Sequence, residues 1–111
     1  MVLAHQGKYD LAMENAQMSL DMRISSFGEE SQETAESHDT IALIYKNQGK
    51  YQEALKHSKK SLDIKEEKLG VNHPDIAKNY SNIGFIYFKL GKYDQALESY
   101  EKALELKQKF F

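Results

Sequence analysis

The tripeptide Gly-Lys-Tyr occurs three times in this sequence at a constant spacing of 42 residues, and this period restricts the possible folds more than any other feature. The three copies begin at Gly7, Gly49 and Gly91. Each copy is followed by an alanine and then a leucine at matching offsets, namely Ala12, Ala54 and Ala96, and Leu20, Leu62 and Leu104. Self-similarity at a fixed period of roughly 20 to 50 residues is typical of repeat proteins. The sequence therefore predicts a short solenoid.

The composition restricts the class of protein further. A length of 111 residues suits a single domain, 1–111, and 41% hydrophobic with 29% charged residues is typical of a globular chain. With a net charge of −2, the chain lacks the excess of positive charge that is typical of proteins that bind nucleic acid or an anionic membrane. With no cysteine, disulfides, thiolate metal sites and cysteine nucleophiles are excluded. The lack of cysteine and of a signal-peptide pattern favours an intracellular, cytoplasmic protein, and no apolar run approaches membrane-span length.

Apolar residues between the tripeptides recur with the helical period of about 3.6 residues. The stripe that follows Gly49 consists of Tyr51, Ala54, Leu55, Ser58, Leu62 and Leu69. Gly49 and Gly91 stand just beyond helical runs, where a residue with a left-handed backbone closes the last turn. Ser31 is a candidate N-cap, and in Asn72-His73-Pro74-Asp75 a capping side chain precedes Pro74 in the first turn of another helix. Five helices are expected, at about 8–26, 31–48, 51–68, 74–90 and 93–109.

The same alignment divides the chain into one partial repeat and two full repeats. Residues 1–30 form the partial repeat, which is mainly a second helix, and residues 31–70 and 71–111 are full repeats. The stub 1–6 aligns with the last turn and a half of a preceding helix. Helices joined by very short turns lie antiparallel, and only the stacking of successive pairs buries a continuous core.

Small residues are expected where the two helices of a pair approach each other. Ala42 and Gly84 on the first helices should face Ala54 and Ala96 on the second helices. Because a helical glycine costs about 1 kcal/mol relative to alanine, Gly84 indicates a close-packed position.

Two segments resemble the signature of the tetratricopeptide repeat. They are Ile41-Ala42-x-x-Tyr45-x-x-x-Gly49-x-Tyr51-x-x-Ala54 and Ile83-Gly84-x-x-Tyr87-x-x-x-Gly91-x-Tyr93-x-x-Ala96, and Tyr100-x-x-Ala103-Leu104 completes the second one. The usual repeat has about 34 residues, whereas this one has 42. With Leu69-Gly70-x-x-His73-Pro74-Asp75 in the loop, the pattern is similar to the long subtype found in kinesin light chain. The resemblance implies an all-α fold, a right-handed α-solenoid of antiparallel helix pairs, and a protein that is not an enzyme.

Two departures from this subtype limit what the resemblance implies. Kinesin light chain repeats often have paired asparagines on the inner face of the first helix, where this chain has Asp39-Thr40 and Ser81-Asn82. The first copy also has Ser31-Gln32 in place of His-Pro. The scaffold and the general use of its inner groove are therefore implied, and a particular cargo motif is not.

In such repeats the first helix of each pair lines the concave face. By this register the lining positions are Glu36, Asp39, Thr40, Leu43, Lys46 and Asn47 in one helix, and Lys78, Ser81, Asn82, Phe85, Phe88 and Lys89 in the next. Spacings of i, i+4 and i+7 place each set on one helix face. Asn82 can hydrogen-bond a peptide backbone, and Lys78 and Lys89 can contact acidic groups. Phe85 and Phe88 can receive an apolar side chain. The alternative is that the phenylalanines pack on neighbouring helices and the polar residues are only solvated.

The sequence predicts no catalytic residue, no cofactor and no metal site. His5, His38, His57 and His73 have no i, i+4 partner and no acidic neighbour in a ligand motif. His73 is expected in a capping loop, and the others on helix surfaces or between helices. The glycines are not clustered as in a phosphate-binding loop, and no nucleophile with a base and an orienting group can be assembled.

The end helices lack the polar outer face that a terminal repeat needs. Phe110 and Phe111 either fold back over the exposed stripe of the last helix or lead toward a further one. The sequence favours a protein–protein interaction scaffold that binds a peptide or a partner helix in its concave groove. The alternative is a structural element that self-assembles as a homo-oligomer through its uncapped helical ends.

Overall fold

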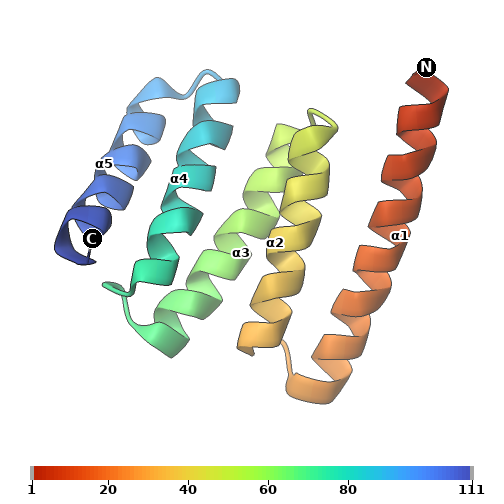
Figure 1. Ribbon diagram of the computed structural model, residues 1–111, viewed down its shortest axis with the longest axis horizontal. Coiled ribbons are helices and arrows are strands. Elements are labelled where there is room, and N and C mark those ends of the chain that lie inside the picture. Colours follow the sequence, from red (N-terminus) through yellow and green to blue (C-terminus); the bar gives the residue numbers. More distant parts are fainter. Residues whose placement is uncertain (1, 111) are drawn as a thin grey trace.

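The computed structural model describes residues 2–110, and the side chains of residues 7–109. This part of the chain contains five helices and no strand: α1 (Val2–Phe27), α2 (Gln32–Asn47), α3 (Tyr51–Leu69), α4 (Pro74–Lys89) and α5 (Tyr93–Phe110). The helices follow one another as antiparallel neighbours in a row, with α1 at one end and α5 at the other (Figure 1). The expected all-α solenoid of antiparallel helix pairs is confirmed.

The first helix differs from the prediction. α1 continues through Gly7, so the expected start near residue 8 and a separate helix end within residues 2–6 are both wrong; residue 1 lies outside the described residues. The left-handed turn at Gly49 is held between two helices, α2 and α3, that pack along their lengths. Continuing the helix adds a backbone hydrogen bond per residue, and the turn is not formed.

Each turn between helices contains one glycine with a left-handed backbone. Gly28, Gly49, Gly70 and Gly91 have φ between +77° and +91°, a region that residues with a Cβ rarely adopt. These glycines lie 21 residues apart. The turn within a helix pair and the turn between pairs therefore both contain a left-handed glycine. The predicted role of Gly49 and Gly91 in closing a helix is confirmed.

Both expected N-caps are found. Ser31 Oγ accepts a hydrogen bond of 3.0 Å from the backbone N–H three residues later, at the start of α2. Before α4, it is His73 whose Nδ1 accepts from the backbone N–H of Asp75, at 3.1 Å. The capping side chain expected in Asn72-His73-Pro74-Asp75 is therefore His73. Pro74 occupies the first helical position, which places the N-cap at the residue directly before it.

The core consists of two apolar clusters along the row. The larger cluster joins α3, α4 and α5 and contains Ala54, Leu55, Leu62, Ile76, Ala77, Ile83, Ile86 and Leu106. The smaller cluster joins α1 and α2 through Ala16, Leu20 and Ile41. Both clusters are drawn from several helices, so each helix buries its stripe only against a neighbour, as stacking requires.

Gly84 allows α4 to approach α5 closely. A Cβ at this position would lie 3.1 Å from two ring carbons of Tyr100. The aromatic ring therefore packs directly on the α4 backbone, which is a close-packing role for the glycine. The nearest atoms belong to Tyr100 and not to the expected Ala96.

A polar cluster joins α2, α3 and α4, and we call it the Asn79 network; it consists of Asp39, Ser61, Lys65 and Asn79. Lys65 Nζ lies 2.6 Å from Asp39 Oδ2 and 3.1 Å from Asn79 Oδ1. Asn79 Nδ2 donates to Asp39 Oδ1 at 3.2 Å and to Ser61 Oγ at 3.3 Å. Asn79 is only 3% exposed, so its amide forms these bonds where water cannot replace them. The network ties the first pair of helices to the next.

Candidate functional site

The predicted lining residues belong to α2 and α4, the two helices that pack on either side of α3. We call this surface the α2–α4 groove, and it comprises Asp39, Thr40, Leu43, Lys46, Asn47, Lys78, Ser81, Asn82, Phe85 and Lys89. The structure brings Asp39, Leu43, Lys46 and Asn82 together around a cleft of about 30 Å³. Its floor is formed by Ala42, Ser58 and Ile86, which the helix register did not include.

Phe85 is the residue of the groove with the most cationic surroundings. The Nζ atom of Lys46, from α2, lies 5.2 Å from the centre of the Phe85 ring, and the Nζ atom of Lys89 lies 5.5 Å from it. Both distances are within the range of cation–π attraction. The ring is half-buried and also packs against the larger apolar cluster. Phe85 therefore contributes to the core and holds two ammonium groups at the groove.

Other predicted residues make contacts with neighbouring parts of the same protein. Both carboxylate oxygens of Asp39 belong to the Asn79 network, and Thr40 Oγ1 donates to a backbone carbonyl of its own helix at 3.2 Å. The Asn47 backbone carbonyl accepts a hydrogen bond of 3.3 Å from the Tyr9 hydroxyl. Phe88 is exposed and packs edge-on against Tyr93 instead of lining the cleft.

Lys78 lies beside a second hollow of about 320 Å³ at the beginning of α4. Its lining residues are Gln32, Glu36, Lys65, Leu69, Pro74, Asp75 and Lys78. Helix register alone predicted only Glu36 and Lys78 here. The other residues come from the first turns of α2 and α4 and from the last part of α3. The register of the two lining helices gives no signal for them.

His38 and His57 meet between α2 and α3. Their Nδ1 atoms are 3.0 Å apart and their ring centres 5.2 Å apart, so the two nitrogens point nearly straight at each other. Burial lowers the pKa of both imidazoles. Lys60 lowers the pKa of His38 further, and His38 lowers that of His57. The pair therefore shares one N–H as a hydrogen bond, and the interhelical packing expected for these residues is found; the side chain of His5 lies outside the described residues.

This geometry does not form a chelate. Chelation needs two lone pairs that converge on a third point, whereas the His38 and His57 nitrogens face each other head-on. Within residues 7–109, no group of three or more His, Cys, Asp or Glu side chains is arranged to hold a metal ion. In the same part of the chain, no helix has both the length and the apolar character needed to cross a membrane.

Comparisons with known proteins agree with this architecture. A tetratricopeptide repeat model matches residues 1–67 and 33–109. The crystal structure of BtubC (BKLC) from P. vanneervenii, a kinesin light chain-like protein of this repeat type, superposes with a TM-score of 0.87 at 26% sequence identity. The match covers 95% of this chain and 41% of BtubC, so the chain spans less than half of that protein. No curated protein sequence matches.

Proposed function

Because the chain belongs to the tetratricopeptide repeat family, we propose that it is an interaction module that holds an extended peptide or a partner helix in the α2–α4 groove. Repeats of this family generally mediate protein–protein interactions and are typically non-enzymatic scaffolds. We assign residues 31–70 and 71–111 to full repeats and residues 1–30 to a partial one. The groove then spans the first helices of both full repeats.

The observation that carries the proposal is the Phe85 ring with Lys46 and Lys89 over it. Lys46 comes from one repeat and Lys89 from the next, so a ligand that contacts both lysines spans the junction of two repeats. Asn82 is half-buried beside them, where its amide can pair with a peptide backbone. A preformed surface of this kind lowers the ordering cost of binding.

The charge of the groove favours a ligand with acidic side chains. Lys46, Lys78 and Lys89 supply three ammonium groups, whereas the carboxylate of Asp39 is already paired with Lys65 at 2.6 Å. The half-buried Phe85 adds an apolar contact between the charges. A peptide that combines an acidic residue with an apolar one fits this chemistry best.

Affinity capture tests the proposal. The native chain and the double variant Lys78→Glu/Asn82→Ala are each immobilised and exposed to a lysate of the source cells. The variant should lose a partner that the native chain retains, because it reverses one charge and removes one hydrogen-bonding amide. Lys8→Glu, on the exposed surface of α1, is the matched control for the charge reversal and should retain the partner. Equal capture by all three proteins would exclude the groove.

A second candidate function is self-assembly through the end helices. The stripe of α5 formed by Tyr93, Leu97, Tyr100 and Leu104 is exposed, and so are Leu11, Met18, Met22 and Phe27 on α1. Apolar surface of this kind is typical of an interaction site. Whether Phe110 and Phe111 fold back over the α5 stripe lies outside the described side chains.

Light scattering tests the second candidate. If the α5 stripe joins copies, the native chain should form oligomers at micromolar concentration, and Leu104→Glu should return it to the monomer mass because a charge replaces an exposed apolar contact. The variant Lys78→Glu/Asn82→Ala should assemble like the native chain. A native chain that is monomeric at this concentration would rule out assembly through this stripe.

A further inference from the structure

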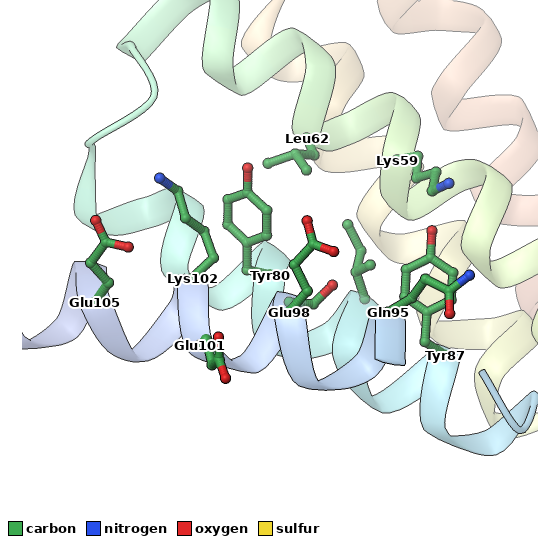
Figure 2. A pocket seen from close by; sticks show the side chains of 11 residues that line it. Lys59, Leu62, Tyr80, Tyr87, Gln95, Glu98, Glu101, Lys102 and Glu105 are labelled. Carbon is green, nitrogen blue, oxygen red and sulfur yellow. The ribbon is translucent and has the colours of Figure 1, made fainter. Parts of the chain in front are cut away.

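A second groove crosses α4 between α3 and α5, and Figure 2 shows its side chains. Its volume is about 540 Å³. We call it the α3–α5 groove, and it is lined by Lys59, Leu62, Tyr80, Ile83, Tyr87, Gln95, Glu98, Ser99, Glu101, Lys102 and Glu105. The two tyrosines and Ile83 come from α4 and form the floor, with Leu62 on the α3 side. The floor is therefore largely apolar and aromatic.

This groove is separate from the α2–α4 groove. Tyr80, Ile83 and Tyr87 are spaced by three and four residues and share one face of α4. At about 100° per residue, Asn82 and Phe85 lie roughly on the opposite face of the helix. A ligand in the α3–α5 groove therefore contacts none of the surface assigned to the proposed function.

Carboxylates dominate the charge of this groove. Figure 2 shows Glu98 and Glu105 on α5 pointing to the side on which Tyr80 stands. Among the described residues, neither glutamate has an oxygen within ion-pairing distance of a lysine or arginine. The ammonium group of Lys59 lies 5.3 Å from the centre of the Tyr87 ring instead. The floor thus already accepts one cation, and on the α5 wall three glutamates outnumber a single lysine, Lys102.

The surroundings of Tyr80 add to this negative charge. Its hydroxyl donates to Glu66 Oε2 at 3.0 Å. Burial raises the pKa of Tyr80 to about 12, with the hydrogen bond to Glu66 and the charges of Glu66 and Asp63 acting in the same direction. Glu66 and Asp63 are both on α3, opposite the acidic wall of α5. Neither residue lines the groove itself, so on this side their charge acts through Tyr80.

The hydroxyl of Ser99 completes the groove. Ser99 lines it and is only 8% exposed. Within the described part of the chain, the Ser99 hydroxyl makes no hydrogen bond. A serine hydroxyl on a helix commonly bonds a carbonyl of the preceding turn, but the Ser99 hydroxyl does not. It therefore remains available to a ligand that enters the groove.

The preceding repeat has a similar groove with the opposite charge. That groove, of about 500 Å³, is lined by His38, Lys56, His57, Lys59, Lys60 and Asp63. At the corresponding positions 42 residues later the chain has Tyr80, Glu98, Ser99, Glu101, Lys102 and Glu105. Two lysines are replaced by glutamates and two histidines by a tyrosine and a serine. The acidic character is therefore specific to the second groove and is not a general property of the fold.

We propose that the α3–α5 groove binds a basic peptide segment of a partner protein. A Lys or Arg side chain of the segment lies along Leu62 and Ile83, with its charged end at Glu98 or Glu105 and beside the rings of Tyr80 and Tyr87. Long basic side chains bury their methylene groups on apolar surface while the charged end stays at a polar rim. Aromatic faces and carboxylates attract the same cation. The Ser99 hydroxyl bonds the peptide backbone.

Fluorescence anisotropy with a short labelled peptide of alternating Arg and Ala tests the proposal, with a Glu–Ala peptide of the same length as the comparison. The native chain should bind the Arg peptide, more weakly as salt increases, and should not bind the Glu peptide at this groove. The double variant Glu98→Gln/Glu105→Gln should bind about five- to tenfold more weakly, because two exposed ion pairs are lost. The control Glu53→Gln/Glu67→Gln has the same net charge on exposed positions of α3. It should bind like the native chain.

Amide chemical shifts locate the site in the same titration. The Arg peptide should shift resonances around Tyr80, Tyr87 and Ser99 and leave those around Asn82 and Phe85 unchanged. Three results would overturn the proposal: no binding of the Arg peptide, an equal loss in the variant and its control, or shifts confined to the α2–α4 groove. Equal capture in the lysate experiment, which would exclude the α2–α4 groove, would not affect any of these readouts, so the two proposals fail separately.

Discussion

Leu62→Ala is expected to lower the free energy of unfolding by about 2–5 kcal/mol, as measured by urea denaturation followed by helical circular dichroism. Leu62 is 8% exposed and belongs to the cluster that joins α3, α4 and α5. Truncation removes buried methyl groups and leaves a cavity that rigid neighbouring helices fill only in part. Because the cluster links successive pairs, the loss should be seen in the unfolding of the whole chain.

Leu104→Ala is the matched control for this variant. Leu104 occupies the same repeat position 42 residues later, in the same kind of helix, but it is 56% exposed. The same truncation should cost less than about 1 kcal/mol there, because little surface is removed from the core. The difference between the two losses in unfolding free energy therefore measures the stabilisation that burial against a neighbouring helix adds at this position. Equal losses would show that Leu62 is not held by the stack.

Asn79→Ala is expected to destabilise the protein by about 1–3 kcal/mol in the same measurement. The side chain connects Asp39, Ser61 and Lys65 through bonds of 3.1 to 3.3 Å. Its removal leaves buried polar groups with fewer partners, and an unsatisfied buried group costs more than a hydrogen bond contributes. Lys65 and Asp39 remain paired at 2.6 Å, which keeps the loss below that of a broken buried ion pair.

The preceding repeat provides the control. Ser37 stands 42 residues before Asn79, is 3% exposed, and its hydroxyl has no hydrogen-bond partner among the described residues. Ser37→Ala should therefore leave stability unchanged or raise it by up to about 1 kcal/mol, because a buried group without a partner is removed. A clear loss of stability in this variant would contradict the assignment of an unpaired hydroxyl.

The sequence predicted those parts of the fold that depend on one helix at a time. Stripes such as the one that contains Leu62 identified the buried faces, and the positive φ of Gly49 and Gly91 agrees with their expected role. Gly7 was misassigned because its tripeptide is identical to the other two copies. What differs is the backbone, because α1 continues through Gly7, and the local sequence does not contain that information.

The parts that could not be predicted depend on side chains from different helices. Helix register placed Asp39 on the groove, but the partners of its carboxylate, Lys65 and Asn79, come from α3 and α4. The register also gave no reason to connect Tyr80 with Glu98, which meet only when α4 and α5 pack. The ten proposed groove residues therefore remain a prediction, although their helix faces follow from spacing.

The exposed stripes at the two ends of the row are unlike each other, and this restricts the symmetry of any assembly. Contact between two α5 stripes uses the same surface on both copies and closes into a two-fold dimer of fixed mass. Contact between the α5 stripe of one copy and α1 of another leaves a free stripe at each end. Such a head-to-tail contact continues into a ring or a filament. An average mass that grows with concentration would therefore identify polymerisation, whereas a plateau at twice the monomer mass would identify the closed dimer.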